Sequence, residues 1–226
     1  AGDAPVASQR PHRQPMNESP TPHPALPAVE AALRTALGEH LRIVSAEPVS
    51  GGNIHTALRL QDASGARFFA KLAPAAQAPM FEAEADGLGA IAASGSLRTP
   101  AVIARGGDEA HAILVLEWLD LQPLTSAADG ARFAEALAAL HRNVGEHFGW
   151  PRDNFIGRTP QANTERDNWA RFFVEQRLRP QFARARAQGF DIELQRQADR
   201  LLDRVPALFL DYRPPESLLH GDLWHG

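Results

Sequence analysis

The chain has 226 residues and a mass of 24.6 kDa, which suits one large domain or two small lobes at about 150 residues per domain. Hydrophobic residues make up 44 % of the chain and charged residues 22 %, a balance that excludes a wholly disordered chain, a collagen and a coiled coil. The net charge of −4 offers no basic excess for a nucleic-acid backbone. The absence of cysteine excludes disulfides, zinc–thiolate sites and cysteine nucleophiles, and it fits a reducing, cytoplasmic location.

Residues 1–24 are expected to form a disordered leader. Seven of the 18 prolines fall in the first 27 residues, and proline fixes φ and lacks a backbone N–H. This segment has no apolar signal-peptide core, and Met16 fits a native start. The longest apolar segment, residues 112–119, is interrupted by Glu117 and is too short to cross a membrane, so no membrane partner is expected.

The next hundred residues alternate between helix and strand patterns. Apolar residues spaced by three and four predict a helix from Leu26 to Leu37 that ends at Gly38. Short apolar runs between Gly-, Asn- and Asp-rich turns predict strands, and a longer apolar period predicts a second helix. The expected strands are 43–49, 54–60, 67–72, 99–105 and 111–116, and the second helix is 80–93.

After Leu121 the pattern becomes mainly helical. Three helices are predicted from apolar residues at helical spacing: Phe133, Leu137 and Leu140; then Trp169, Phe172, Phe173 and Gln176, bending or ending near Pro180; then Ile192, Ala198, Leu201, Leu202 and Val205, stopped by Pro206. We therefore predict an α+β protein with a strand-rich lobe over 25–118 and a helical lobe over 119–226.

Lys71 lies within an apolar strand, Phe68 to Leu72, and two interpretations are open. A strand lysine is commonly a solvated edge residue. Alternatively it points into a cleft and neutralises phosphate oxygens, held there by an acid on the next helix. Glu82 and Glu84 differ by about 200° around that helix, so only one can face the strand. Glu84 is favoured because Leu88, four residues on, would pack on the same face.

Two further segments could carry chemistry. Gly51 and Gly52 are compatible with a simple hairpin turn or with a loop whose backbone N–H groups approach a phosphate. In the segment 218–224, LLHGDLW, Asp222 follows an apolar run and could accept a proton from an attacking hydroxyl, or merely form a turn. His220 and His225 lack a third ligand, so no metal site is predicted from them.

Four stretches together carry a resemblance to a known family: residues 49–54 with 57–60 after them, 68–72 with 80–85 after them, 148–161 (FGWPRDNFIGRTPQ) and 218–224. The sequence resembles the fructosamine kinase (ketosamine-3-kinase) family, of the protein-kinase-like superfamily that also holds aminoglycoside and choline kinases. A His-Gly-Asp triplet occurs in many small-molecule kinases, whereas residues 148–161 are typical of this family. The resemblance runs from about residue 27 to the C-terminus.

The resemblance implies a two-lobed protein-kinase-like fold, with a five-stranded antiparallel sheet in a nucleotide-binding lobe and a helical substrate-binding lobe. It implies ATP-dependent phosphorylation of the 3-hydroxyl of ketosamines, as small molecules or on glycated proteins, which is the chemistry of protein deglycation. Carried over, Lys71 would hold the ATP phosphates, Glu84 would pair with it, and Gly51, Gly52 and Asn53 would belong to the phosphate loop. Glu117, Trp118 and Leu119 would form the linker whose backbone meets adenine. Asp222 would be the catalytic base, and Trp224 would lie beside the sugar.

The family pattern continues Ser-Gly-Asn after the tryptophan, whereas this chain has His225 and then ends at Gly226. The asparagine and aspartate that hold Mg²⁺ in the family are expected beyond that point. A metal neutralises charge that develops on the transferred phosphoryl group. We therefore expect this chain to be an inactive fragment of a longer kinase. Two alternatives are another small-molecule kinase of the aminoglycoside or choline type, and a kinase-like protein that binds a ligand or partner without catalysis.

Overall fold

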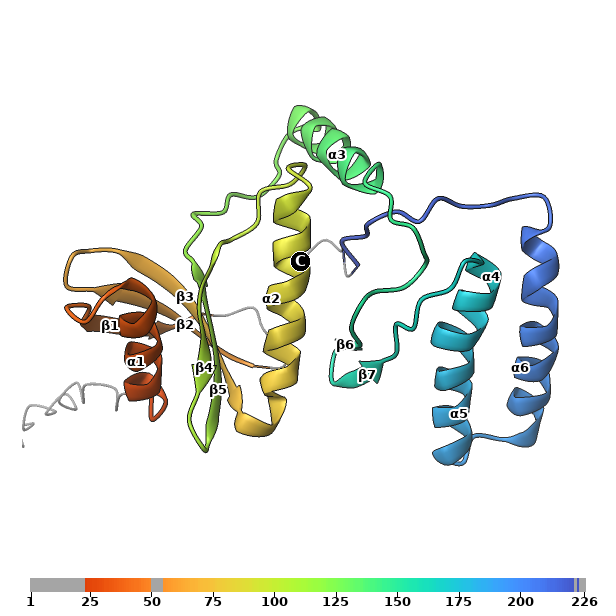
Figure 1. Cartoon of the computed structure of the whole chain (residues 1–226), viewed down its shortest axis with the longest axis horizontal. Coiled ribbons are helices and arrows are strands. Elements are labelled where there is room, and N and C mark those ends of the chain that lie inside the picture. Colours follow the sequence, from red (N-terminus) through yellow and green to blue (C-terminus); the bar gives the residue numbers. More distant parts are fainter. Residues whose placement is uncertain (1–22, 50–54, 222, 224–226) are drawn as a thin grey trace, which may run out of the picture.

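The computed structural model describes residues 23–49, 55–221 and 223. Its first half is built around one antiparallel sheet with the strand order β1-β2-β3-β5-β4 (Figure 1). The five strands are β1 (Ile43–Pro48), β2 (Thr56–Asp62), β3 (Arg67–Pro74), β4 (Val102–Gly107) and β5 (His111–Glu117). The expected five-stranded antiparallel sheet is therefore present, and β3, which carries Lys71, lies in its interior.

One helix covers each face of the sheet. Helix α1 (Leu26–Leu37) buries Val29 and Leu33 against one face, where it meets Leu60 and Ala70. Helix α2 (Ala78–Ala93) buries Phe81 and Ala85 against the other face, and Leu114 belongs to this second cluster. Because successive strand residues point to opposite faces, Phe68, Ala70 and Leu72 pack toward α1. Phe69 and Ala73 pack toward α2, and Lys71 shares their face.

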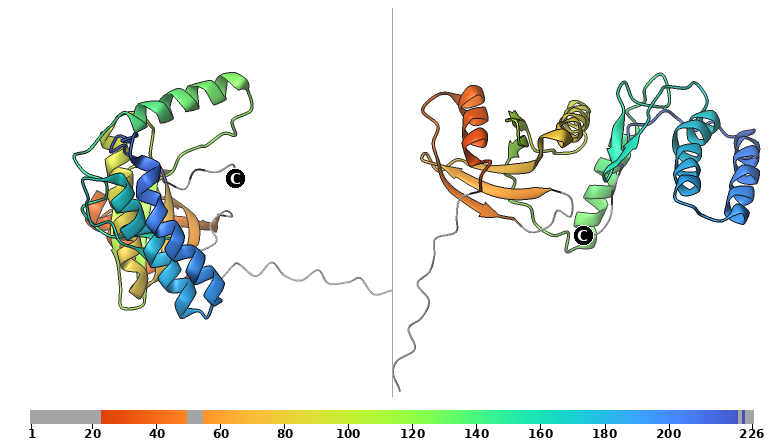
Figure 2. Two further views of the ribbon diagram at one scale, coloured as in Figure 1. Left: turned by 90° about the vertical axis from the view of Figure 1, so that its right-hand side faces the viewer. Right: turned by 90° about the horizontal axis from the view of Figure 1, so that it is seen from below.

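The second half is mainly helical and lies beyond α2 (Figures 1 and 2). Helix α3 (Ala127–His141) begins at a capping box formed by Ser126 and Asp129. A short hairpin follows, and then a helical segment that changes type along its length. These elements are β6 (Asn154–Ile156), β7 (Thr159–Gln161), α4 (Trp169–Phe172), a π-helical turn (Phe173–Leu178), α5 (Arg179–Ala187), α6 (Ile192–Arg204) and a 3₁₀ turn (Val205–Phe209).

Three details differ from the sequence expectation or refine it. The hairpin of β6 and β7 was not predicted. In α6 the predicted apolar face is partly wrong, because Ile192 is 74 % exposed and Leu201 is 42 % exposed, whereas Gln195 is buried. The helix predicted to bend or end near Pro180 does not end there, because the π-helical turn passes at Leu178 into α5, which runs from Arg179 to Ala187.

The predicted leader falls mostly on residues 1–22, which lie outside the described residues. His23 already contacts the folded part: its Nδ1 accepts a hydrogen bond from the Ala25 N–H at 3.2 Å, and its ring lies 6.3 Å from that of His111. Among the described residues, none of the helices combines the length and the apolar character needed to traverse a lipid bilayer.

Candidate active site

Lys71 is an inward-facing residue of an interior strand, so its solvated-edge interpretation is wrong. Strand β3 is paired with β2 on one side and β5 on the other, with Lys71 opposite Ala57 and Leu114. Its side chain is 23 % exposed and points to the face that α2 covers. It is also the single lysine of the chain, in which 23 residues are lysine or arginine. The other 22 of these residues are arginine, so Lys71 carries the only side-chain ammonium group of the chain.

Glu84 of α2 reaches Lys71. The Lys71 Nζ donates to Glu84 Oε2 at 2.5 Å, and the Glu84 side chain is 31 % exposed. Glu82 turns away and accepts from Arg105 of β4 at 3.1 Å, a more exposed pair. The rotation of about 100° per residue along a helix explains this division. The structure thus pairs Lys71 with Glu84, the glutamate that helix geometry favours, and not with Glu82.

His55 lies beside this ion pair, just before β2. Its ring meets Phe81 of α2 edge-on at 4.8 Å, and Lys71 Nζ is 5.9 Å from the centre of the Phe81 ring. Burial lowers the pKa of the His55 imidazole, and the Lys71 charge lowers it further, while Glu84 opposes the shift. The His55 Nε2 and Gln77 Oε1 atoms are both buried and have no hydrogen-bond partner among the described residues. The Gln77 side chain lies close enough to the His55 imidazole to oppose the lowering of its pKa, so these two polar groups face each other.

Arginine side chains form hydrogen bonds around the predicted linker, residues 117–119, at the end of β5. Glu117 accepts from Arg98 at 2.5 Å and from the Ala101 N–H at 3.2 Å. The Trp118 Nε1 donates to Asp120, which Arg67 also holds through two hydrogen bonds. Leu119 is half-buried next to them. The linker is therefore held to β3, the strand of Lys71, while its contact with adenine stays a prediction.

The remaining predicted site residues, Gly51, Gly52, Asn53, Asp222 and Trp224, lie outside the described residues. The chain that leads to Asp222 is described, however. Ser217 forms an isolated antiparallel bridge with Val144, and the Leu218 N–H donates to the Asn143 carbonyl at 2.8 Å. His220 then lines a cavity of about 860 Å³ together with residues of α2, including Ala83 and Gly87. His220 therefore approaches the helix that carries Glu84.

Sequence reasoning missed the contacts between α2 and the segment 148–161. Trp150 Nε1 donates to Asp86 Oδ2 at 2.6 Å, and Arg152 Nη1 donates to the Glu82 carbonyl at 3.1 Å. These contacts join residues 64 and 70 positions apart, which local patterns do not reveal. The sole lysine, by contrast, was a signal available in the sequence.

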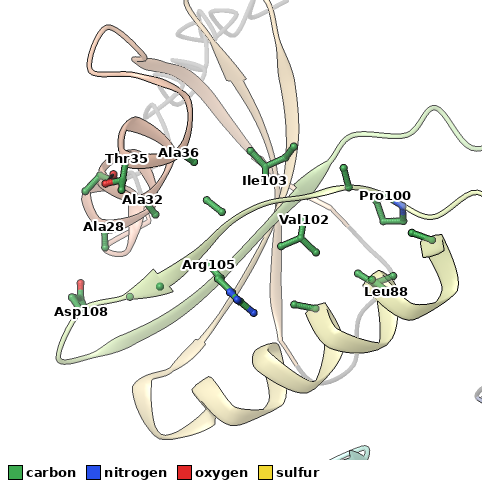
Figure 3. Close-up of a pocket in the computed structure, with 18 residues that line it drawn as sticks. Ala28, Ala32, Thr35, Ala36, Leu88, Pro100, Val102, Ile103, Arg105 and Asp108 are labelled. Carbon is green, nitrogen blue, oxygen red and sulfur yellow. Dashed lines mark hydrogen bonds between the residues drawn. The ribbon is translucent and has the colours of Figure 1, made fainter. Parts of the chain in front are cut away.

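A second cavity lies away from these residues, at the open edge of the sheet (Figure 3). It measures about 880 Å³ and is lined by α1, α2 and β4, with Thr35, Arg105 and Asp108 among few polar side chains. None of the predicted site residues that the structure describes lines it. Over the described part of the chain, no group of three or more His, Cys, Asp or Glu side chains could hold a metal ion.

Solved structures with the same architecture carry a family name. The chain superposes on a "putative fructosamine-3-kinase" from Haemophilus somnus with a TM-score of 0.77 and 27 % identity, covering 89 % of this chain and 67 % of that one. A second protein of that description, from Thermobifida fusca, gives a TM-score of 0.74 and 31 % identity, covering 88 % of this chain and 68 % of the other. The fold is thus the kinase-like fold of these proteins.

Sequence comparison agrees with this fold assignment. A "probable ketoamine kinase" of Synechocystis is 40 % identical over 84 % of this chain and 63 % of that protein. One of Vibrio cholerae is 33 % identical over 88 % of this chain and 68 % of its own length. The chain therefore spans about two thirds of the length of these relatives. A family model described as fructosamine kinase matches residues 25–226, and the chain belongs to that family.

Proposed function

We propose that these residues serve ATP-dependent phosphorylation of the 3-hydroxyl of ketosamines, the adducts formed when sugars glycate amines. The Lys71–Glu84 ion pair is the observation that carries the proposal. An ammonium fixed by a carboxylate on the inner face of a sheet can neutralise the phosphate oxygens of ATP without moving during the reaction.

In the proposed reaction the ketosamine 3-hydroxyl attacks the γ-phosphorus of ATP. The new O–P bond forms as the bond to the β-phosphate oxygen breaks, ADP leaves, and the hydroxyl proton passes to the Asp222 carboxylate. Asp222 lies outside the described residues. Its assignment as the base rests on the family resemblance of residues 218–224.

The other assignments complete the proposal. Residues 25–118 would bind the nucleotide, with Gly51, Gly52 and Asn53 covering the phosphates and the backbone of 117–119 meeting adenine. Residues 119–226 would bind the ketosamine, with Trp224 beside the sugar, and the cytoplasm would be the compartment. Mg²⁺ stays a prediction. The described residues offer no cluster of three or more His, Asp or Glu side chains that could hold it.

Phosphate transfer from radiolabelled ATP tests the proposal. The 226-residue chain and the longest natural protein that contains it would each be offered a fructosyl amine, choline and an aminoglycoside. We expect label on the fructosyl amine with the longer protein. Transfer to choline or the aminoglycoside instead would assign a different substrate class. Tight nucleotide binding without any transfer by the longer protein would favour a non-catalytic binding role.

A further inference from the structure

Residues 148–166 form a rigid unit, held by hydrogen bonds across its base. Phe148 and Arg166 exchange two backbone hydrogen bonds of 2.9 Å each, and the Trp150 N–H donates to the Asn163 carbonyl at 3.0 Å. Asn163 is 2 % exposed, and its side chain donates to the Arg152 carbonyl at 3.1 Å. Gly149 has φ +139°, and a Cβ there would meet the Asn163 oxygen at 2.6 Å, so the backbone approach requires glycine.

A half-buried arginine fixes this unit to the helical half. The Arg177 guanidinium donates to the Ala162 carbonyl and to Asn163 Oδ1, both at 2.6 Å. Its central carbon lies 4.5 Å from the centre of the Phe172 ring. Arg177 belongs to the π-helical turn 173–178, so this turn holds the unit from behind. Any contact that residues 148–166 make with α2 is therefore linked to the helical half.

The front of the unit touches α2. Trp150 donates to the Asp86 carboxylate at 2.6 Å, and Arg152 donates to the Glu82 carbonyl at 3.1 Å. Asp86 follows Glu84 by two residues, or about 200° of helical rotation, so these two carboxylates leave opposite sides of the helix. Helix α2 therefore lies between Lys71 on the sheet side and Trp150 on the other side.

We propose that Trp150 and Arg152 are positioning residues, which set the rotation and depth of α2 and thereby hold Glu84 against Lys71. A helix held only by Phe81, Ala85 and Ile91 could still slide or turn on the apolar sheet face, because apolar packing is not directional. Hydrogen bonds to Asp86 and to the Glu82 carbonyl are directional and remove that freedom. Any effect on phosphoryl transfer rests on the proposed function, whereas the effect on the Lys71–Glu84 contact does not.

Carbodiimide cross-linking measures that contact directly. The reagent joins an amine to a neighbouring carboxylate as an amide with loss of water, and Lys71 is the only lysine of the chain. Trypsin normally cuts after Lys71. A Lys71–Glu84 cross-link blocks that cut and leaves one peptide, residues 68–98, lighter by one water. Fragmentation of this peptide assigns the link to Glu84 rather than to Glu82 or Asp86.

The test compares Trp150→Phe, which keeps an aromatic ring but loses the N–H donor, with Asp86→Ala, which removes the acceptor from α2. A matched control, Arg105→Gln, removes an exposed ion pair that α2 makes with the sheet. We expect the cross-link yield to fall about fivefold in the first two variants, because each loses a hydrogen bond to a charged group. The double variant should fall no further, and the control should stay at the parental yield.

Two readouts separate the possible failures. Circular dichroism identifies a variant that has not folded, in which case the other variant decides the question. Parental cross-link yields in both folded variants would overturn the positioning role, whatever the enzyme does. A lowered yield together with unchanged phosphoryl transfer by the longest natural protein would leave the positioning role intact and contradict the proposed function of the ion pair.

Discussion

Replacing Glu84 by glutamine, with Glu82→Gln as its matched control, isolates the charge that faces Lys71. Both substitutions preserve side-chain size on the same helix, but only Glu84 touches the lysine, at 2.5 Å between Nζ and Oε2. Glu82 forms a looser pair with Arg105 at 3.1 Å. A difference between the two variants therefore reports the direction of the carboxylate and not a general loss of acidity on α2.

The expected magnitudes differ for stability and for catalysis. The Lys71 and Glu84 side chains keep 23 % and 31 % of their exposure, so solvent screens their attraction. The free energy of unfolding should then fall by less than about 1 kcal/mol in Glu84→Gln. Exchanging the carboxylate acceptor for a neutral amide oxygen, while the ammonium stays charged, costs about 1–2 kcal/mol of lysine positioning. Since 1.4 kcal/mol is about tenfold, kcat/KM for ATP should fall about tenfold.

The assay is phosphoryl transfer to a fructosyl amine by the longest natural protein that contains the chain, beside nucleotide affinity measured on the 226-residue chain. Urea unfolding provides the stability of each variant. Glu82→Gln should stay within about twofold of the parent, because exposed pairs contribute little. Equal losses in the two variants, or parental activity in a folded Glu84→Gln protein, would refute the reasoning.

Three further predictions concern stability. Gly149→Ala should lower the free energy of unfolding by about 2 kcal/mol or more, since φ is +139° and the new Cβ meets the Asn163 oxygen. Its control, Gly130→Ala in α3, has open space around it and should raise the free energy of unfolding by at most about 1 kcal/mol. Urea unfolding of both variants tests this. Arg177→Met should lower the free energy of unfolding by about 2–3 kcal/mol, because the buried Asn163 side chain and the half-buried Ala162 carbonyl lose their charged donor. An unchanged urea midpoint would contradict it. Because the pKa of His55 is lowered in the folded protein, the unfolded chain binds more protons below about pH 6.5. The free energy of unfolding should therefore fall from about pH 7.5 to about pH 5.5. His55→Gln should show a smaller fall in thermal midpoint over that range.

Much of the strand-rich half could be predicted because its signals are local. The predicted helix from Leu26 to Leu37 coincides with α1, and Gly38 ends it with φ +117°. Turn residues delimit the strands, and the rotation around a helix distinguishes Glu84 from Glu82. Each of these inferences uses neighbours within a few positions of one another.

The parts that escaped prediction depend on distant contacts. Strands β6 and β7 have three residues each, too few for an alternating pattern to stand out. Their supporting contacts, such as that from Trp150 to Asp86, join chain segments that only the fold brings together. In α6, the buried Gln195 accepts from Arg186 of α5 through its amide oxygen, a contact between two helices that the apolar spacing within α6 does not reveal.

The most direct test of the account is affinity labelling of Lys71 by an acyl-phosphate derivative of ATP, which acylates an amine lying beside the bound phosphates. The chain offers no other lysine, so the modified peptide identifies the site without ambiguity. We expect acylation of Lys71 that excess ATP suppresses and that Glu84→Gln weakens. Labelling confined to the terminal amine, or acylation of Lys71 that ATP does not suppress, would contradict it.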